Sequence, residues 1–481
     1  MKNSPAGVFR AFDATELSRA LSAKELSVSE AIDHHLSTLE SFAHLNAVVA
    51  ARDPEALSRE VALAQEMIDR GTGSVLTGIP ITVKDTVAVA GLPLSAGSRL
   101  LLEHRSNLDA GVVKRVREAG GLVLGKTNCP EFGFGIGCSN DLFGPTLNPI
   151  AENLSPGGSS GGEAASVAAG ISLLGIGTDY GGSLRWPAQC TGILSIRPTP
   201  GRLPARGQLL GSGLSGTDGN SRFRDASLQA QLQVPGFLAR SVADLESALF
   251  ATATSSERVG KLPPGNFELR SIPIGWSDGA NIGAISHEVQ TMMADLAALL
   301  NQDKFAITYV PDAFGGARQA FDELRSYEDL ADLRRLARGR EEEPTAVVRA
   351  LIDSPRPPMQ SFDDATRKAR EKRSEGLGQL DATPLFLLPV AGCAAVGFDE
   401  KATIDGVSYQ GFELMAHCRA ISLLAVPVVS IPAARTRSGL PLSVQVIAPP
   451  FQEHLALAMA RRIESLGGGW QMAAHRGPIP P

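Results

Sequence analysis

The residues best suited to chemistry in this sequence are serines embedded in glycine, in two clusters at residues 157–162 and 181–183. Glycine allows close backbone approaches, so a hydroxyl among glycines stays reachable and neighbouring N–H groups can point at one spot. Acyl transfer requires such a site, with a nucleophile and with donors aimed where negative charge develops. A lone cluster of this kind usually marks a loop. Residues 163–177, between the two clusters, are too apolar for a linker and predict a buried helix leading into a strand.

Ser183, which follows two glycines, is the candidate nucleophile, and it needs a base within hydrogen-bond reach. The chain has eight histidines, but none stands in a motif-like setting. Lys84 ends the apolar run of residues 79–83, where burial would lower its pKa and let the neutral amine act as a base. The same position also suits a lysine that reaches from the end of a strand to solvent. The pattern of residues by itself leaves both roles open.

A longer pattern surrounds these residues. The segments GGSSGGEAA at 157–165, GTDYGGSLRWPA at 177–188 and GILSIRPTPGRLP at 192–204 resemble the amidase signature family. Further landmarks of that family follow in order: ITVKD at 81–85, GKTNCPEFG at 125–133 and LPLSVQVI at 440–447. The resemblance covers nearly the whole length. It implies a hydrolase that cleaves a carboxylic amide, or a related C–N bond, to an acid and an amine or ammonia.

The resemblance also implies the roles of three residues in catalysis. Lys84, Ser159 and Ser183 match the family's triad of a lysine, a serine preceded by a cis peptide bond, and a nucleophilic serine. Ser159 would relay the proton between Lys84 and Ser183 and then to the leaving amine, while an acyl-enzyme forms on Ser183. Ser160 is expected to support the loop by hydrogen bonding. Because Lys84 must be neutral to act, we expect activity to rise towards alkaline pH.

The segment that ends at the nucleophile is expected to supply the oxyanion hole. A single donor of this kind is typically worth ~2.7–4 kcal/mol of the barrier. Asp179 and Arg185 flank the segment, where they could pair to brace the loop or contact the substrate, and the sequence leaves both open. Cys129, in the segment at 125–133, is expected in a supporting or substrate-binding loop. The expected donors are the backbone N–H groups of Tyr180, Gly181, Gly182 and Ser183.

Two other motif matches are rejected on their context. Residues 157–161 fit the G-x-S-x-G nucleophile elbow of α/β-hydrolases, but that elbow follows a strand directly, and residues 148–156 are polar and broken by prolines. Residues 120–127 fit the spacing of a P-loop, but the four middle residues are strand-like rather than glycine-rich. His34 and His35 are adjacent and lack the spacing of metal ligands. No metal site is predicted, and no cofactor is expected.

The elements that must position these residues alternate between helix and strand. Asp13 with Glu16, and Ser27 with Glu30, are spaced as capping boxes. They predict two helices, and residues 53–70 predict a third. Strand signals at 78–84 and 122–124 enclose a helix signal at 111–119, and this alternation indicates an α/β core. For such a core, the family resemblance implies a large central mixed β-sheet sandwiched by helices.

One domain is expected across residues 1–481, because no clean linker divides the strand signals. Within it we expect a helical N-terminal layer at 1–75, a signature core at 76–200 and a variable cap at about 310–420. A long loop is expected from Arg202 to about Val234. The pocket walls are expected from residues 129–138, from this loop and from the cap. Aromatic residues there favour an aryl or medium-sized acyl group, and aliphatic amides, ureides and hydrazides stay open.

Composition argues against several classes of partner. With a net charge of −6, the chain lacks the excess positive charge that is typical of proteins that bind nucleic acid or an anionic membrane. The five cysteines include no Cys-x-x-Cys pair and are odd in number, which is typical of reduced thiols in the cytoplasm. No signal peptide is evident, and no apolar run approaches the ~18 residues of a membrane span. We therefore expect a cytoplasmic protein that acts on a small-molecule amide without nucleic acid or membrane, with a homodimer left open.

The main alternative is the A-type component of a tRNA-dependent amidotransferase, or another glutaminase that depends on a partner. Those components typically read GGSSGGS and NMDEF, whereas this chain has Glu163 after GGSSGG and reads NCPEF at 128–132. Both departures resemble stand-alone amidases. A third hypothesis is a non-catalytic binding protein on the same fold, and competent residues at all three triad positions weaken it. Turnover by the isolated chain would separate these alternatives.

Overall fold

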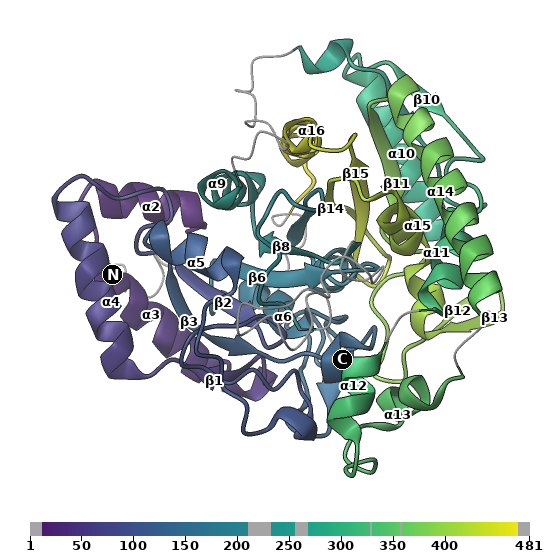
Figure 1. Cartoon of the computed structure of the whole chain (residues 1–481). Coiled ribbons are helices and arrows are strands. Elements are labelled where there is room, and N and C mark those ends of the chain that lie inside the picture. The colour runs from purple at the N-terminus through teal and green to yellow at the C-terminus, as the bar shows by residue number, and fades with distance from the viewer. Residues whose placement is uncertain (1–11, 210–231, 255–267, 328–329, 356–357, 470–481) are drawn as a thin grey trace.

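The computed structural model describes residues 12–209, 232–254, 268–327, 330–355 and 358–469. A central sheet crosses the molecule, with N-terminal helices (purple) at one edge and helices of the C-terminal half (green) at the other (Figure 1). This arrangement confirms the predicted α/β fold with a large mixed sheet. Within the described ranges, no helix has both the length and the apolar character needed to cross a membrane.

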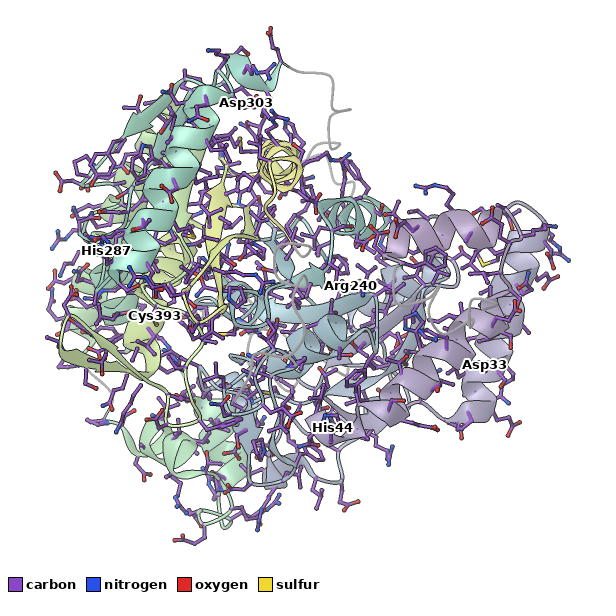
Figure 2. All side chains as sticks on the ribbon, turned by 180° about the vertical axis from the view of Figure 1, so that it is seen from behind. Asp33, His44, Arg240, His287, Asp303 and Cys393 are labelled. Atoms are coloured by element: carbon purple, nitrogen blue, oxygen red, sulfur yellow. The ribbon has the colours of Figure 1, made fainter. Side chains whose placement is uncertain are left out.

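The N-terminal layer consists of α2 (Ala14–Ser22), α3 (Val28–Ser41) and α4 (Pro54–Asp69). Both predicted capping boxes form, because the cap side chain accepts from the third helical N–H and the glutamate there accepts from the cap N–H. The side chain of Asp53 caps α4. Arg240, labelled in Figure 2, donates to the Phe12 carbonyl and so links this layer to the sheet.

The sheet has eleven strands among the described residues, in the order β1-β3-β2-β6-β8-β7-β14-β15-β11-β9-β10. β2 is parallel to β3 and β6, and β9 is parallel to β10 and β11, while the other neighbours are antiparallel. The strands are β1 (Val48–Ala51), β2 (Pro80–Lys84), β3 (Leu122–Thr127), β6 (Leu174–Asp179), β7 (Leu194–Arg197), β8 (Val234–Ala239), β9 (Ile274–Trp276), β10 (Ile307–Tyr309), β11 (Leu385–Pro389), β14 (Val428–Arg435) and β15 (Pro441–Ile447).

The three parallel strands β2, β3 and β6 create the edge on which the candidate site is built. Every residue of these strands is buried, as in a strand covered on both faces. The carboxyl ends of parallel strands meet at one edge of a sheet. Lys84 ends β2 and pairs in register with Thr127 at the end of β3, while Asp179 ends β6. Lys84 and the segment that follows β6 therefore lie together at this edge.

Helices cover both faces of the sheet. They are α5 (Gly111–Glu118), α6 (Gly161–Ala169), α7 (Arg185–Thr191), α9 (Val242–Thr252), α10 (His287–Gln302) and α16 (Glu453–Ser465). The helix predicted at 111–119 is confirmed by α5. Asp303 follows α10 and accepts hydrogen bonds from Arg270 and from Arg462 of α16, which ties these elements together (Figure 2).

The C-terminal half contributes the remaining helices and a small hairpin. They are α11 (Ala317–Arg325), α12 (Ala331–Ala337), α13 (Ala346–Asp353), α14 (Met359–Ala382), α15 (Ala416–Leu424) and a hairpin of β12 (Lys401–Ile404) and β13 (Val407–Gln410). The loop predicted from Arg202 to about Val234 lies mostly outside the described residues, and β8 begins where it ends. The remaining short elements are β4 (Ser139–Asn140), β5 (Gly144–Pro145) and the 3₁₀ turns η1 (Ala43–Leu45), η2 (Arg99–Leu101), η3 (Glu131–Gly133), η5 (Leu269–Ser271) and η6 (Gly411–Met415).

Candidate active site

A pocket of about 550 Å³, open solvent at its mouth included, lies over the carboxyl edge of β2 and β6. Lys84, Ser159 and Ser183 all line it. Thr178, Tyr180 and Gly181 from the end of β6 line it as well. The structure thus brings the three residues of the predicted triad, which are far apart in sequence, to one cavity.

Lys84 is buried at the end of β2, with 1% of its surface exposed. Its Nζ donates hydrogen bonds to Ser159 Oγ at 2.7 Å and to Thr178 Oγ1 at 3.0 Å. No carboxylate of the described residues lies within ion-pair distance of this amine. Burial lowers the pKa of Lys84 to about 8, because the charged form is poorly solvated there. Lys84 therefore does not reach out to bulk solvent, which was the alternative that the sequence left open.

The loop that carries Ser159 is held closely between its neighbours. Its Gly158–Ser159 peptide bond is cis, and a Cβ added at Gly158 would lie 2.1 Å from the Gly137 carbonyl oxygen. Ser160 Oγ donates to the Thr178 carbonyl at 3.3 Å and accepts from the Thr178 N–H at 3.4 Å. The Ser160 N–H donates to the Ser183 carbonyl at 3.2 Å. Ser160 thus joins the Ser159 loop both to β6 and to the segment of the candidate nucleophile.

The segment 180–183, between β6 and α7, presents Ser183 to the pocket. The Gly182 N–H is engaged, because it donates to Asp179 Oδ1 at 2.8 Å. The N–H groups of Gly181 and Ser183 have no hydrogen-bond partner among the described residues. Gly182 has a φ of +126°, and a Cβ there would lie 2.7 Å from Cys418 Cβ, so this turn requires glycine.

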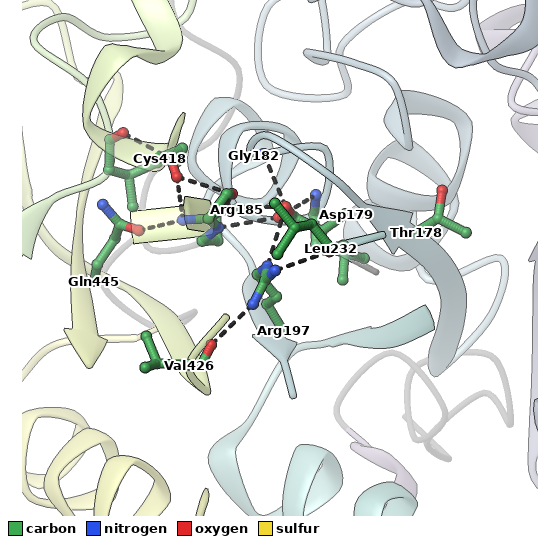
Figure 3. Close-up of polar contacts among 12 residues, drawn as sticks. Thr178, Asp179, Gly182, Arg185, Arg197, Leu232, Cys418, Val426 and Gln445 are labelled. Carbon is green, nitrogen blue, oxygen red and sulfur yellow. Dashed lines mark hydrogen bonds and ion pairs between the residues drawn. The ribbon is translucent and has the colours of Figure 1, made fainter. Parts of the chain in front are cut away.

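Asp179 and Arg185 form a fully buried ion pair beneath this segment (Figure 3). Arg185 Nε and Nη2 donate to the two carboxylate oxygens at 3.0 and 2.9 Å. Arg185 Nη1 also donates to the Cys418 carbonyl at 2.9 Å and to Gln445 Oε1 at 2.6 Å. Burial alone would raise the pKa of Asp179, but the charges of Arg185 and Arg197 lower it to about 2. Of the two roles left open by the sequence, the pair braces the loop, and neither residue lines the pocket.

Comparison with known proteins identifies the family of this chain. A family model described as "Amidase" matches residues 30–457 of the chain. The chain belongs to the amidase signature family.

Individual members of the amidase signature family align over nearly the whole chain. It is 32% identical to the A-type component of the glutamyl-tRNA(Gln) amidotransferase of Ralstonia nicotianae, over 93% of this chain and 96% of that one. It is 29% identical to an indoleacetamide hydrolase of Bradyrhizobium diazoefficiens, over 98% and 89%. A crystal structure of an amidase superposes with a TM-score of 0.83 at 26% identity, over 95% of this chain and 100% of that one.

Cys129 lies away from the amidase pocket, although the segment around it contributes to the wall. The thiol is fully buried and does not line the cavity, and burial raises its pKa. Phe132, Gly133 and Phe134 line the pocket instead. Leu209 and Gln233, at the two ends of the undescribed residues 210–231, also line it.

Several residues of the site escaped the sequence analysis. Thr178 precedes Asp179 in the signature segment, near the end of a buried strand. Its contact with Lys84 could have been predicted from that position. The far wall of the pocket has no such signal, because it comes from α11, η6 and α15 late in the chain. That wall consists of Phe321, Arg325, Phe412, Met415 and Arg419.

Glu163, noted as a departure from the amidotransferase pattern, is buried on α6 against β2 and β3. Its carboxylate accepts from Thr82 Oγ1 and Thr127 Oγ1, each at 2.7 Å. Burial raises the pKa of Glu163 to about 8. It does not line the pocket. In the described part of the chain, no group of three or more His, Cys, Asp or Glu side chains is arranged to hold a metal ion.

Proposed function

We propose that this chain hydrolyses a linear carboxylic amide through an acyl-enzyme on Ser183, with Lys84 as the base and Ser159 as the proton relay. Membership of the amidase signature family supports hydrolysis of a C–N bond. The observation that carries the proposal is the 2.7 Å hydrogen bond from the buried Lys84 Nζ to Ser159 Oγ, in a pocket that Ser183 also lines. A serine hydroxyl becomes a useful nucleophile only when a neighbouring group can take its proton.

The first half of the reaction forms the acyl-enzyme. Ser183 Oγ attacks the amide carbonyl carbon, its proton passes to Ser159 Oγ, and the Ser159 proton passes to neutral Lys84. The tetrahedral intermediate then collapses, and the C–N bond breaks. The leaving nitrogen takes a proton from Ser159, which is replenished from protonated Lys84. Lys84 and Ser159 end this half in their starting protonation states, as a repeated cycle requires.

The second half of the reaction releases the acid. A water attacks the Ser183 ester and gives a proton through Ser159 to Lys84. Collapse of the second tetrahedral intermediate breaks the ester bond, and Ser183 Oγ recovers its proton by the same route. Thr178 keeps Lys84 aimed at Ser159, because its hydroxyl accepts the second hydrogen bond of the amine.

The backbone N–H groups of residues 180–183 are assigned as the donors that stabilise the negative charge on the carbonyl oxygen. Those of Gly181 and Ser183 are unengaged among the described residues, which suits them to receive an oxyanion. The Gly182 N–H is shared with Asp179, and that bond orients the segment rather than the substrate. Donors fixed in advance in a site that excludes water stabilise developing charge without reorganising during the reaction.

A partner-dependent amidotransferase component is the second candidate, because the chain is 32% identical to such a protein over 93% of its length. The two candidates differ in what the isolated chain can do. A stand-alone hydrolase turns over simple amides by itself, whereas the second candidate predicts turnover of glutamine only with its partner proteins present. Indole-3-acetamide is a reasonable first neutral substrate, since an indoleacetamide hydrolase is 29% identical over 98% of the chain.

The test is to incubate the isolated chain with indole-3-acetamide, simple anilides and glutamine, with and without hydroxylamine. An acyl-enzyme can be captured by hydroxylamine, so the proposal predicts that part of the acid product is diverted to the hydroxamate. Both products should disappear in Ser183→Ala and persist in Ser166→Ala, which removes a buried hydroxyl outside the pocket lining. Hydrolysis that survives in Ser183→Ala would overturn the proposal.

A further inference from the structure

One wall of the pocket is built from alternating aromatic rings and guanidinium groups. Phe321 and Arg325 come from α11, Phe412 from η6, and Arg419 from α15. The guanidinium carbon of Arg325 lies 4.4 Å from the centroid of the Phe412 ring, and that of Arg419 lies 5.4 Å from the same centroid. A guanidinium stacked in this way keeps the N–H groups at its edge free to bind a planar anion.

The positive charges of this wall are not balanced within the described residues. Asp322 is a carboxylate that forms an ion pair with this wall. It pairs with Arg419 at 2.5 Å, and it also pairs with Arg318 at 2.9 Å. The side chain of Arg325 makes no hydrogen bond or ion pair to any described residue, and it stacks on the rings of Tyr180 and Phe412. Arg419 Nε is buried and lacks a hydrogen-bond partner in the same part of the chain. Since arginine stays protonated in proteins, the wall presents excess positive charge to the pocket.

This wall adjoins the segment that carries the nucleophile. A Cβ added at Gly181 would lie 3.4 Å from Arg419 Cγ and 3.5 Å from Phe321 Cζ. The Tyr180 and Phe321 rings are in contact with centroids 5.2 Å apart, and Arg325 lies 6.0 Å from the Tyr180 centroid. A substrate whose carbonyl meets Gly181 therefore has the aromatic and cationic wall directly beside it.

We infer that Arg325, with Arg419 beside it, binds an anionic group of the substrate, so that the chain acts on amides that also carry a carboxylate beside a flat apolar portion. The flat portion packs on Phe321 and Phe412, and the carboxylate takes the unpaired N–H groups of Arg325. Arginine and carboxylate match as planar partners, and charge-assisted hydrogen bonds of this kind exceed neutral ones in strength. A neutral amide leaves the Arg325 charge without a counter-ion in a partly buried site. The inference rests on the proposed function, since it assigns the substrate class of the same pocket.

A matched pair of covalent probes tests the inference without knowledge of the natural substrate. The probes are 4-(fluorosulfonyl)benzoate, which is an anion, and its neutral methyl ester. In either case Ser183 Oγ forms a bond to sulfur, the S–F bond breaks, fluoride leaves, and the serine proton passes through Ser159 to Lys84. The rate of Ser183 labelling by each probe is followed by intact mass, and peptide mapping confirms the residue. The measured quantity is the ratio of the acid rate to the ester rate.

For the wild-type chain we expect the acid to label Ser183 about tenfold faster than the ester or more, as one charge-assisted hydrogen bond allows. In Arg325→Met the ratio should fall to about one or below because the acid rate is lost, and continued labelling by the ester reports that the variant is folded. Arg325→Lys should keep part of the preference, because it keeps the charge but loses the planar fork. Arg370→Met, which removes an exposed arginine on α14, is the matched control and should leave the ratio unchanged.

Three results would overturn the inference. Equal labelling by the two probes in the wild-type chain would show that the wall does not select an anion, although Ser183 would stand as the nucleophile. A preference for the acid that persists in Arg325→Met would assign the selection to another group. Labelling of neither probe at Ser183 would remove the proposed nucleophile, and with it both the inference and the proposed function.

Discussion

Lys84 and Lys126 lie on the neighbouring parallel strands β2 and β3, and both are fully buried, but they meet different acceptors. Lys126 Nζ donates to the carboxylate of Asp85 at 3.2 Å and to the carbonyls of Val87 at 2.7 Å and Pro93 at 3.1 Å. All three of its protons are thus bound by acceptors that have no proton to pass on. Lys126 is a structural cation that fastens β3 to the segment after β2.

Lys84, by contrast, donates to the two hydroxyls of Ser159 and Thr178 and meets no carboxylate among the described residues. A hydroxyl both accepts and donates, so a proton can continue from Ser159 towards Ser183. Burial lowers the pKa of both lysines, but at Lys126 the charge of Asp85 opposes that effect. The partners of a buried lysine, more than its burial, therefore decide whether it stabilises the fold or exchanges a proton.

Removal of Lys84 should abolish most of the activity and leave the fold intact. Lys84→Ala should lower kcat/KM by about 10³-fold or more, since general-base catalysis contributes up to ~10⁴. The far-UV circular dichroism should match that of the wild-type chain, because no carboxylate is left without its counter-charge. Steady-state kinetics on an amide substrate measures the loss. A variant that keeps more than a tenth of the activity would contradict a base role for Lys84.

Removal of Lys126 should act on stability. Lys126→Met leaves the buried carboxylate of Asp85 without its cation, so the free energy of unfolding should fall by about 3–5 kcal/mol in urea titration. Adding Asp85→Asn should recover part of this loss, because the stranded charge is then gone. If Lys126→Met were as stable as the wild-type chain but inactive, the assignment of a structural role would be wrong.

The pH dependence of the activity should report the lowered pKa of Lys84. With the pKa of Lys84 lowered to about 8, kcat/KM should rise about tenfold per unit below that pH and level off above it. A profile that is flat between pH 6 and 9 would contradict a base role for Lys84.

The same pKa predicts a change in stability. Between about 8 and 10.5, the ordinary value, the unfolded chain binds more protons at Lys84 than the folded chain, so stability rises with pH there. The cost of burying the charged amine is fully present below pH 8. Lys84→Met should therefore gain in melting temperature relative to the wild-type chain at pH 7, and most of that gain should vanish by pH 10.5.

Loss of the second hydrogen-bond acceptor of Lys84 should reduce the activity modestly. Thr178→Val removes a hydroxyl that stabilises the charged amine, so kcat/KM should fall by about three- to tenfold, the value of one hydrogen bond. The midpoint of the pH profile should also move below that of the wild-type chain. Thr252→Val, which removes a buried hydroxyl in α9, is the matched control. An unchanged midpoint in Thr178→Val would show that Thr178 does not tune Lys84.

Local signals in the sequence predicted a large share of the fold. The capping boxes at Asp13 and Ser27 and the buried strand that ends at Lys84 depend on residues close together in the chain, and all three form. Short strands such as β8 and β10 were missed, because a few residues of sheet carry little periodicity when their partners come from elsewhere.

The candidate site also has a part that could be predicted from local sequence and a part that could not. The glycine-rich segments around Ser159 and Ser183 could be found because glycine is required locally, as at Gly158 beside the Gly137 carbonyl. The wall of Phe321, Arg325 and Arg419 could not, because nothing within α11 or α15 indicates that these side chains line one pocket, with Phe321 and Arg419 against Gly181. Such contacts are products of packing between distant segments.

Labelling by phenylmethylsulfonyl fluoride, followed by peptide mapping, tests whether Lys84 activates Ser183 through Ser159. We expect a single adduct on Ser183 in the wild-type chain, with a labelling rate that rises through pH 8, and no adduct in Lys84→Ala under the same conditions. An adduct on Ser159 or Ser160, or labelling of Ser183 at the wild-type rate in Lys84→Ala, would contradict it.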